Sequence, residues 1–245
     1  MRSSKSVGRI TGLLLFVHLV AGLMLPYILL KPALAPPGFL ANAAASSLQL
    51  RAAVLLLFMS GAITLAVAVT ALPVFRRYSD RLALLLLALS AVNLALHAVE
   101  NGTLLSMLSL SREYASSGSA DATLFQALAV VVGSARKWAH FTHLLVVGTW
   151  IFALFTVLWR FALVPRPLAA LGLLASLLQV TGVPLWAMLG HRPVTEMAMP
   201  LAPIYLAVAV WLMAQGFEEP QRPTSHSTSA SASGPDAAGG SNPRT

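Results

Sequence analysis

Two short groups of polar residues interrupt stretches of the sequence that are otherwise apolar. The first group consists of Ser90, Asn93, His97, Glu100 and Asn101, at steps of three, four, three and one. On a helix these steps place the five side chains along one face. Imidazole and carboxylate groups bind zinc, iron and manganese, and histidine also exchanges protons near neutral pH. This face is therefore a candidate for metal or proton chemistry.

The second group opens the next apolar stretch, which reads KWAHFTH from Lys137. Lys137, His140 and His143 recur every three residues, so they also share a helix face. If the two stretches are antiparallel helices, the rise of about 1.5 Å per residue brings His97 and Glu100 to a depth similar to that of His143. The predicted metal ligands are therefore His97, Glu100, His140 and His143.

The elements that must position these residues are membrane-spanning helices. The chain of 245 residues is 57% hydrophobic and only 10% charged, against about 25% charged in an ordinary soluble domain. Its uncharged intervals are about as long as the roughly 20 residues that cross a bilayer. The sequence predicts an all-α polytopic membrane protein, a six-transmembrane-helix bundle over residues 1–217, with spans at 10–30, 52–75, 82–108, 138–160, 167–190 and 197–217. Glu100 alone interrupts a span.

The sequence also predicts the structure of two segments outside the spans. Residues 218–245 are rich in Ser, Pro, Ala and Gly and lack aromatic residues, so we expect a disordered tail. The mostly apolar residues 122–133 are too few to span a bilayer and predict an interfacial or re-entrant helix before the fourth span. After the fifth span, His191 and Glu196 are expected to lie near the outer end of the polar group.

The basic residues predict the orientation of the bundle. Ten of them fall on the side of the two termini and six on the other side. The positive-inside rule then places both termini in the cytoplasm and the His and Glu group in the outer half of a cell membrane. Because the basic residues flank apolar stretches, we expect a lipid bilayer as partner and no nucleic acid. With no cysteine, thiolate chemistry is excluded.

Three interpretations of the polar group remain open. As a metal site it would hold a divalent ion, and with one coordination position free it would support a membrane hydrolase acting on a lipid-like substrate. As a proton or substrate pathway it would belong to a small transporter. As a structural group it would only hold helices together. Haem ligation by two histidines is a variant of the first interpretation.

Other polar or small residues inside the spans have structural explanations. The isolated His18 is expected to be a satisfied interior histidine. Glycines inside spans favour close helix contact, and this applies to Gly12, Gly22, Gly61, Gly148, Gly172 and Gly182.

Two segments also resemble a known family. Arg9 and the residues after it read RITGLL, and the entry to the fifth span reads VPRPLAALGL from Val164. In these features the chain resembles the bacterial membrane proteins grouped as domain of unknown function family 4386, over roughly Ser6 to Phe217. The resemblance implies a six-span protein of the bacterial inner membrane and supplies no catalytic residues.

Overall fold

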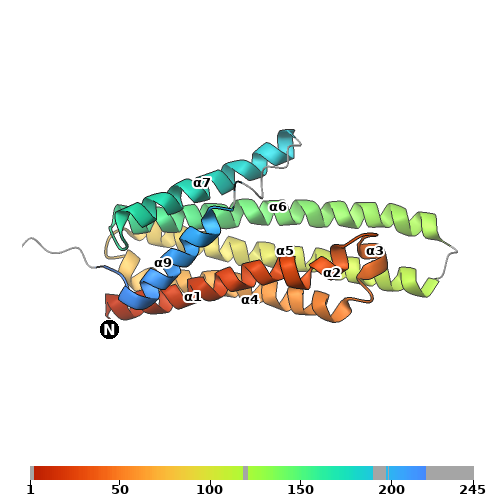
Figure 1. Ribbon diagram of the computed structural model, residues 1–245, viewed down its shortest axis with the longest axis horizontal. Coiled ribbons are helices and arrows are strands. Elements are labelled where there is room, and N and C mark those ends of the chain that lie inside the picture. Colours follow the sequence, from red (N-terminus) through yellow and green to blue (C-terminus); the bar gives the residue numbers. More distant parts are fainter. Residues whose placement is uncertain (1–2, 118–120, 190–196, 198, 219–245) are drawn as a thin grey trace, which may run out of the picture.

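Long helices run side by side along most of the molecule (Figure 1). The computed structural model describes residues 3–117, 121–189, 197 and 199–218, and within these ranges the regular elements are all helical. In chain order they are α1 (Ser4–Met24), the π-helix η1 (Leu25–Leu29), α2 (Lys31–Leu34), α3 (Phe39–Asn42), α4 (Ser47–Phe75), α5 (Asp80–Ser117), α6 (Ala122–Arg160), α7 (Arg166–Leu189) and α9 (Leu201–Gln215). The all-α prediction is confirmed. The predicted tail, except for Glu218, lies outside the described residues.

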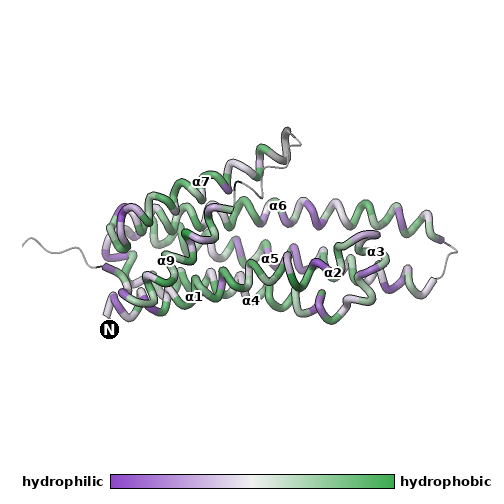
Figure 2. Tube along the Cα trace, in the orientation of Figure 1, coloured by the Kyte–Doolittle hydropathy of each residue, from purple (hydrophilic) through white to green (hydrophobic). Residues whose placement is uncertain are grey.

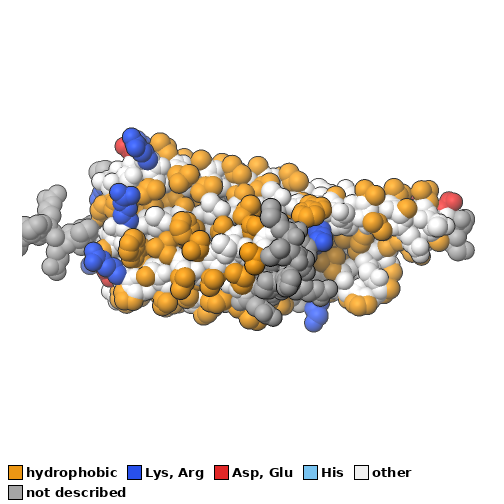
Figure 3. Space-filling view, turned by 90° about the horizontal axis from the view of Figure 1, so that it is seen from above, with side chains coloured by type: hydrophobic (Ala, Val, Ile, Leu, Met, Phe, Trp, Pro, Cys, Tyr) orange, Lys and Arg blue, Asp and Glu red, His pale blue; other side chains and the backbone are white. Residues whose placement is uncertain are grey.

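Five of the predicted spans are long and apolar enough to cross a membrane: residues 4–29, 47–75, 80–117, 122–160 and 166–185. The sixth differs, because α9 has 15 residues where 21 were predicted at 197–217. It packs obliquely between α1 and α7 (Figure 1). On the face seen in Figure 3, apolar side chains spread along the helices, with few charged side chains among them. The chain thus has the architecture of a multi-pass membrane protein.

The buried face of α5 explains how polar residues come to lie inside this bundle. It begins with Ala83 and Leu86, which join a large apolar core formed with α1, α4, α6, α7 and α9. It ends with Leu104, Met107 and Leu108, which join a second apolar core formed with η1, α2, α3 and α4. Between the two cores the same face carries the polar stripe, all of it buried. In Figure 2 the long helices are largely green, with purple positions along them and at their ends.

The hairpin of α5 and α6 extends beyond the other helices. At about 1.5 Å per residue, the 38 residues of α5 and the 39 of α6 are nearly twice as long as a hydrocarbon core of about 30 Å requires. The predicted interfacial helix at 122–133 is therefore wrong as a separate element. Residues 122–133 are helical, but they continue directly into the fourth span because no proline interrupts the segment. A ring contact between Tyr114 and Phe125, with centroids 5.7 Å apart, joins the two helices there.

Close helix contact through glycine is confirmed at several positions. A Cβ on Gly12 would lie 2.7 Å from the carbonyl oxygen of Ala209 on α9. Added Cβ atoms on Gly148 and Gly172 would meet Val180 and Phe155 at 2.9 and 2.0 Å. Gly22 is different, because nothing lies within 4 Å of the Cβ position there. The prediction of close packing is therefore wrong for Gly22, which borders empty space.

Candidate functional site

Helices α5 and α6 bring the predicted ligands together. His97 and His143 face each other with ring centroids 4.1 Å apart, and one turn away Glu100 faces His140. This order of pairs is what two antiparallel helices with i,i+3 spacing produce. The predicted meeting of the two polar groups is therefore observed. The predicted cap residues His191 and Glu196 lie outside the described residues.

Three of the four side chains form a compact buried group, which we call the His97/Glu100/His143 cluster. The exposed fractions are 1% for His97, 1% for Glu100 and 8% for His143. One potential ligand atom from each side chain lies within 4.8 Å of the other two. The Glu100 Oε2 to His143 Nδ1 distance is 3.2 Å, close to the roughly 3.3 Å edge of a tetrahedron with zinc bonds of about 2.0 Å. The cluster is thus of a size that can hold a metal ion.

The polar atoms of this cluster lack hydrogen bonds. Both ring nitrogens of His97, both ring nitrogens of His143 and Oε2 of Glu100 are buried without a hydrogen-bond partner. His143 Nδ1 is within ion-pair distance of Oε2, but the pair does not have hydrogen-bond geometry. Buried polar atoms are nearly always paired, because an unpaired group loses its hydration without compensation. A histidine can direct only one of its two ring nitrogens at a given point, so three atoms, one from each side chain, can reach a common ion. Buried polar atoms without hydrogen bonds need an explanation, and a bound ion is one.

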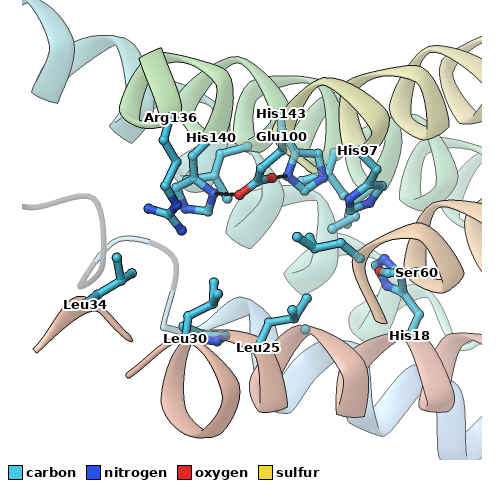
Figure 4. A pocket seen from close by; sticks show the side chains of 16 residues that line it. His18, Leu25, Leu30, Leu34, Ser60, His97, Glu100, Arg136, His140 and His143 are labelled. Carbon is cyan, nitrogen blue, oxygen red and sulfur yellow. Dashed lines mark hydrogen bonds and ion pairs between the residues drawn. The ribbon is translucent and has the colours of Figure 1, made fainter. Parts of the chain in front are cut away.

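His140 contacts the cluster from outside. Its Nδ1 lies 2.9 Å from Oε1 of Glu100, and its side chain is 39% exposed. A carboxylate only accepts hydrogen bonds, so Nδ1–H of His140 donates. This bond occupies Oε1 and leaves Oε2 directed at the two other histidines (Figure 4). His140 is therefore placed to orient the carboxylate.

Gly61 on α4 makes room for His97. A Cβ at this position would lie 2.7 Å from Cδ2 of His97 and 3.1 Å from Cα of Leu94. The distance to Cδ2 is shorter than real Cβ contacts and the distance to Leu94 is tighter than most of them, so a larger residue would force the His97 ring or the contact between α4 and α5 to shift. The absence of a side chain at Gly61 thus fixes where His97 can lie.

Two further residues of the polar stripe, Ser90 and Asn93, serve helix contacts. Trp150 donates its indole N–H to Ser90 Oγ at 2.7 Å. Asn93 donates to Thr64 Oγ1 at 3.1 Å. These bonds join α5 to α6 and α4, so Ser90 and Asn93 have the structural role that was one of the open interpretations.

The cluster forms one wall of a cavity of about 470 Å³. The same wall carries His140 and Arg136, and the opposite wall is made by leucines of η1, α2 and α4 (Figure 4). Pro26 has no backbone N–H to continue the α-helix, and the chain forms the π-helix η1 there, with Leu30 N donating to Leu25 O at 2.9 Å. π-Helical turns of this kind occur frequently at functional sites.

His18 lies beside a second cavity of about 260 Å³ between α1, α6, α7 and α9. Its Nδ1 is 3.2 Å from the hydroxyl of Tyr205 on α9. The expected satisfied interior histidine is therefore confirmed for Nδ1. His18, Gly22 and Ile151 border both cavities, so the two spaces adjoin.

Arg136 and Gly61 were not predicted as parts of this site, although Gly61 was expected to allow close helix contact and does so. Arg136 precedes His140 by four residues and His143 by seven, so it shares their helix face, whereas the prediction placed Lys137 there. Arg136 lines the cavity. For Gly61 the only signal was its place within a span, which many glycines share.

The fold and the cluster define a multi-pass membrane protein with a buried His and Glu group in its interior. A family model described as "Domain of unknown function (DUF4386)" matches residues 10–216. The chain belongs to this family, as the resemblance in its first and fifth spans indicated. No curated protein and no solved structure matches the chain.

Proposed function

We propose that this protein is a membrane metalloprotein that binds one divalent ion through His97, Glu100 and His143. The observation that carries the proposal is the convergence of buried donor atoms without hydrogen bonds, all within reach of a single ion. Two imidazoles and one carboxylate are a ligand set used by catalytic zinc sites. In a tetrahedral zinc site with bonds of about 2.0 to 2.2 Å the ligand atoms lie about 3.3 to 3.6 Å apart. Ligand atoms within 4.8 Å of one another therefore reach a common ion after side-chain shifts of about 1 Å.

We propose metal-assisted hydrolysis as the reaction class. Three protein ligands leave a zinc coordination position for water, and bound water acts as hydroxide near neutral pH. In ester hydrolysis the hydroxide adds to the carbonyl carbon or the phosphorus. The bond to the leaving oxygen breaks, and that oxygen takes up a proton. The cavity lies within apolar helices, so a lipid-like substrate fits this site better than a polar one.

The metal content of the purified full-length chain tests this proposal. After expression with added zinc, iron and manganese, elemental analysis is expected to find one divalent ion per chain. A visible absorbance spectrum of the same sample separates this outcome from haem bound by two histidines. A chain that holds no more metal than a His97→Ala/His143→Ala double variant would contradict the proposal.

A proton pathway is the second candidate, because His18 connects the two cavities below the cluster. Histidines and a carboxylate lining a cavity are typical of proton relays in transporters. This function needs no metal, and it needs His18. Proton uptake into vesicles that His18→Ala abolishes, by a chain free of metal, would favour it over the metalloprotein.

His140 is expected to support the metal without binding it. His140→Ala frees Oε1 of Glu100 and lets the carboxylate rotate, which we expect to lower zinc affinity about 10- to 100-fold. Competition with a fluorescent zinc chelator measures the change. His140→Asn, whose amide can donate to the same oxygen, is expected to restore much of the affinity. Equal affinity in His140→Ala and the unaltered chain would contradict this role.

We also propose that both termini are cytoplasmic. Asp80, Arg160 and Arg166 mark helix ends at the end of the molecule where α1 begins (Figure 1). About 30 Å along α5 from Asp80, the helix reaches Glu100. The cluster would then lie near the outer surface, with the hairpin of α5 and α6 beyond it. A reporter fused at Thr245 that is active only outside the cytoplasm would reverse this orientation.

A further inference from the structure

The 470 Å³ cavity has two chemically different walls. Along η1, α2 and α4 its lining is aliphatic and includes Leu25, Leu30, Leu34 and Leu57. Along α5 and the outer part of α6 it is polar, with the His97/Glu100/His143 cluster, His140 and Arg136, and farther along α6 the lining becomes aliphatic at Leu144, Val147 and Ile151. Its volume lies within the roughly 300 to 1,000 Å³ of small-molecule sites. A cavity with one apolar and one polar wall suits an amphipathic ligand.

Arg136 gives the polar wall an anion-binding group. Its side chain extends beside His140 into the cavity (Figure 4). Its Nε is buried without a hydrogen-bond partner, and among the described residues Arg136 forms no ion pair. A buried guanidinium is costly unless it meets an anion, and it pairs well with carboxylate or phosphate. The charge of Glu100 acts on Arg136, but that carboxylate is already bonded to His140, so Arg136 retains donors for a ligand head group.

The apolar space continues past this cavity. The second cavity, of about 260 Å³, is lined largely by Leu19, Leu23, Leu201 and Ala202. The two cavities share His18, Gly22 and Ile151 in their linings, and nothing lies within 4 Å of a Cβ position on Gly22. An aliphatic chain that starts near Arg136 can therefore extend past Gly22.

The geometry points to an anionic amphiphile as the ligand of this cavity, an aliphatic chain with a carboxylate or phosphate head group. Arg136 binds the head group two helical turns from His143, and the aliphatic chain of the ligand follows the leucines toward Gly22. This inference rests on the proposed function for its catalytic meaning, because it places the head group of the substrate on the same cavity wall as the proposed metal ligands. The binding itself depends on Arg136 and Gly22, neither of which belongs to the proposed ligand set.

Native mass spectrometry of the full chain in maltoside micelles tests this with three probes: dodecyl phosphate, dodecanoate and the neutral dodecanol. We expect both anions to bind at least about tenfold more tightly than dodecanol, since a charge-assisted hydrogen bond contributes that much. Arg136→Gln is expected to abolish this preference. Lys137→Gln, which removes a neighbouring charge that does not line the cavity, should preserve it. The ratio between dodecyl phosphate and dodecanoate identifies the preferred head group.

Gly22→Leu tests the path of the ligand's aliphatic chain. The new side chain fills the junction, displaces about two methylene groups and should weaken all three probes roughly tenfold. Gly102→Leu is the matched control, because a Cβ there also meets nothing within 4 Å and Gly102 lines neither cavity. An anion preference that survives in Arg136→Gln, or unchanged binding in Gly22→Leu, would overturn the inference.

Metal content measured on the same samples separates the two proposals. Probe binding as expected by a chain without metal contradicts only the metalloprotein. One ion per chain without selective probe binding contradicts only the ligand inference.

Discussion

Replacing His143 with alanine is expected to lower the zinc affinity of the chain by more than about a hundredfold. Residues that merely orient a ligand cost about 10- to 100-fold when removed, and His143 is proposed to bind the ion directly. Its ring lies 3.2 Å from Oε2 of Glu100 and 4.1 Å, between centroids, from the ring of His97. No other described side chain on α6 can replace it, because His140 is bonded to Oε1 of the same carboxylate. Chelator competition measures the affinity.

The matched control is His18→Ala. His18 lines the same cavity, but it pairs with Tyr205 and lies outside the His97/Glu100/His143 cluster. The His18→Ala variant should keep its zinc affinity within about a factor of three of the unaltered chain, a small part of the loss expected when a metal ligand is removed. The metal-free melting temperatures separate loss of the site from loss of the fold. Equal losses of zinc affinity in the two variants would show that His143 has no special role.

Gly61→Ala is expected to lower zinc affinity about 10- to 100-fold without changing any ligand. The added methyl group would approach Cδ2 of His97 to 2.7 Å, so the ring must leave its place beside His143. Displacing a ligand has an effect similar to removing the residues that orient it. The crowding also lowers stability, because overpacking a tight helix contact costs about 1 to 3 kcal/mol. Zinc titration and thermal unfolding of the same sample give both quantities.

Gly22→Ala is the control for this substitution. The same methyl group enters empty space there, and replacing glycine within a helix favours the helix by roughly 0.5 to 1 kcal/mol. We expect unchanged zinc affinity and equal or higher stability. If Gly61→Ala bound zinc as tightly as Gly22→Ala, the packing of α4 would not determine the position of His97.

The members of the cluster could be predicted from the sequence, because polar residues are rare inside membrane spans. A charged residue inside a span has to be compensated by protein, so Glu100 and the histidines at i,i+3 spacing could be selected by type and period. The period gives the face of one helix, but it does not give the neighbour of each side chain. His140 therefore could not be separated from His97 and His143, although it bonds to Glu100 from outside the cluster. Gly61 could not be selected either, because its role appears only when α4 packs on α5.

The all-α architecture could be predicted from the long uncharged intervals, but the ends of the helices were harder to predict. Charged residues such as Arg112 and Lys137 marked the limits of the predicted spans. In the structure, α5 and α6 continue through these residues, because a helix can extend past the membrane when it pairs with a neighbour. Contacts such as Tyr114 on Phe125 are tertiary and leave no periodic signal. The sixth span was predicted too long for a related reason, since hydropathy extended the prediction to residues that α9 does not include.

Anomalous X-ray diffraction at the zinc edge, from crystals of the zinc-loaded full-length chain, tests the metal centre most directly. We expect one strong peak between α5 and α6, about 2.0 to 2.2 Å from a nitrogen of His97, a nitrogen of His143 and Oε2 of Glu100. His140 should remain hydrogen-bonded to Oε1. Zinc-loaded crystals with no peak at these three side chains, or with the zinc peak elsewhere, would contradict the proposed metal centre.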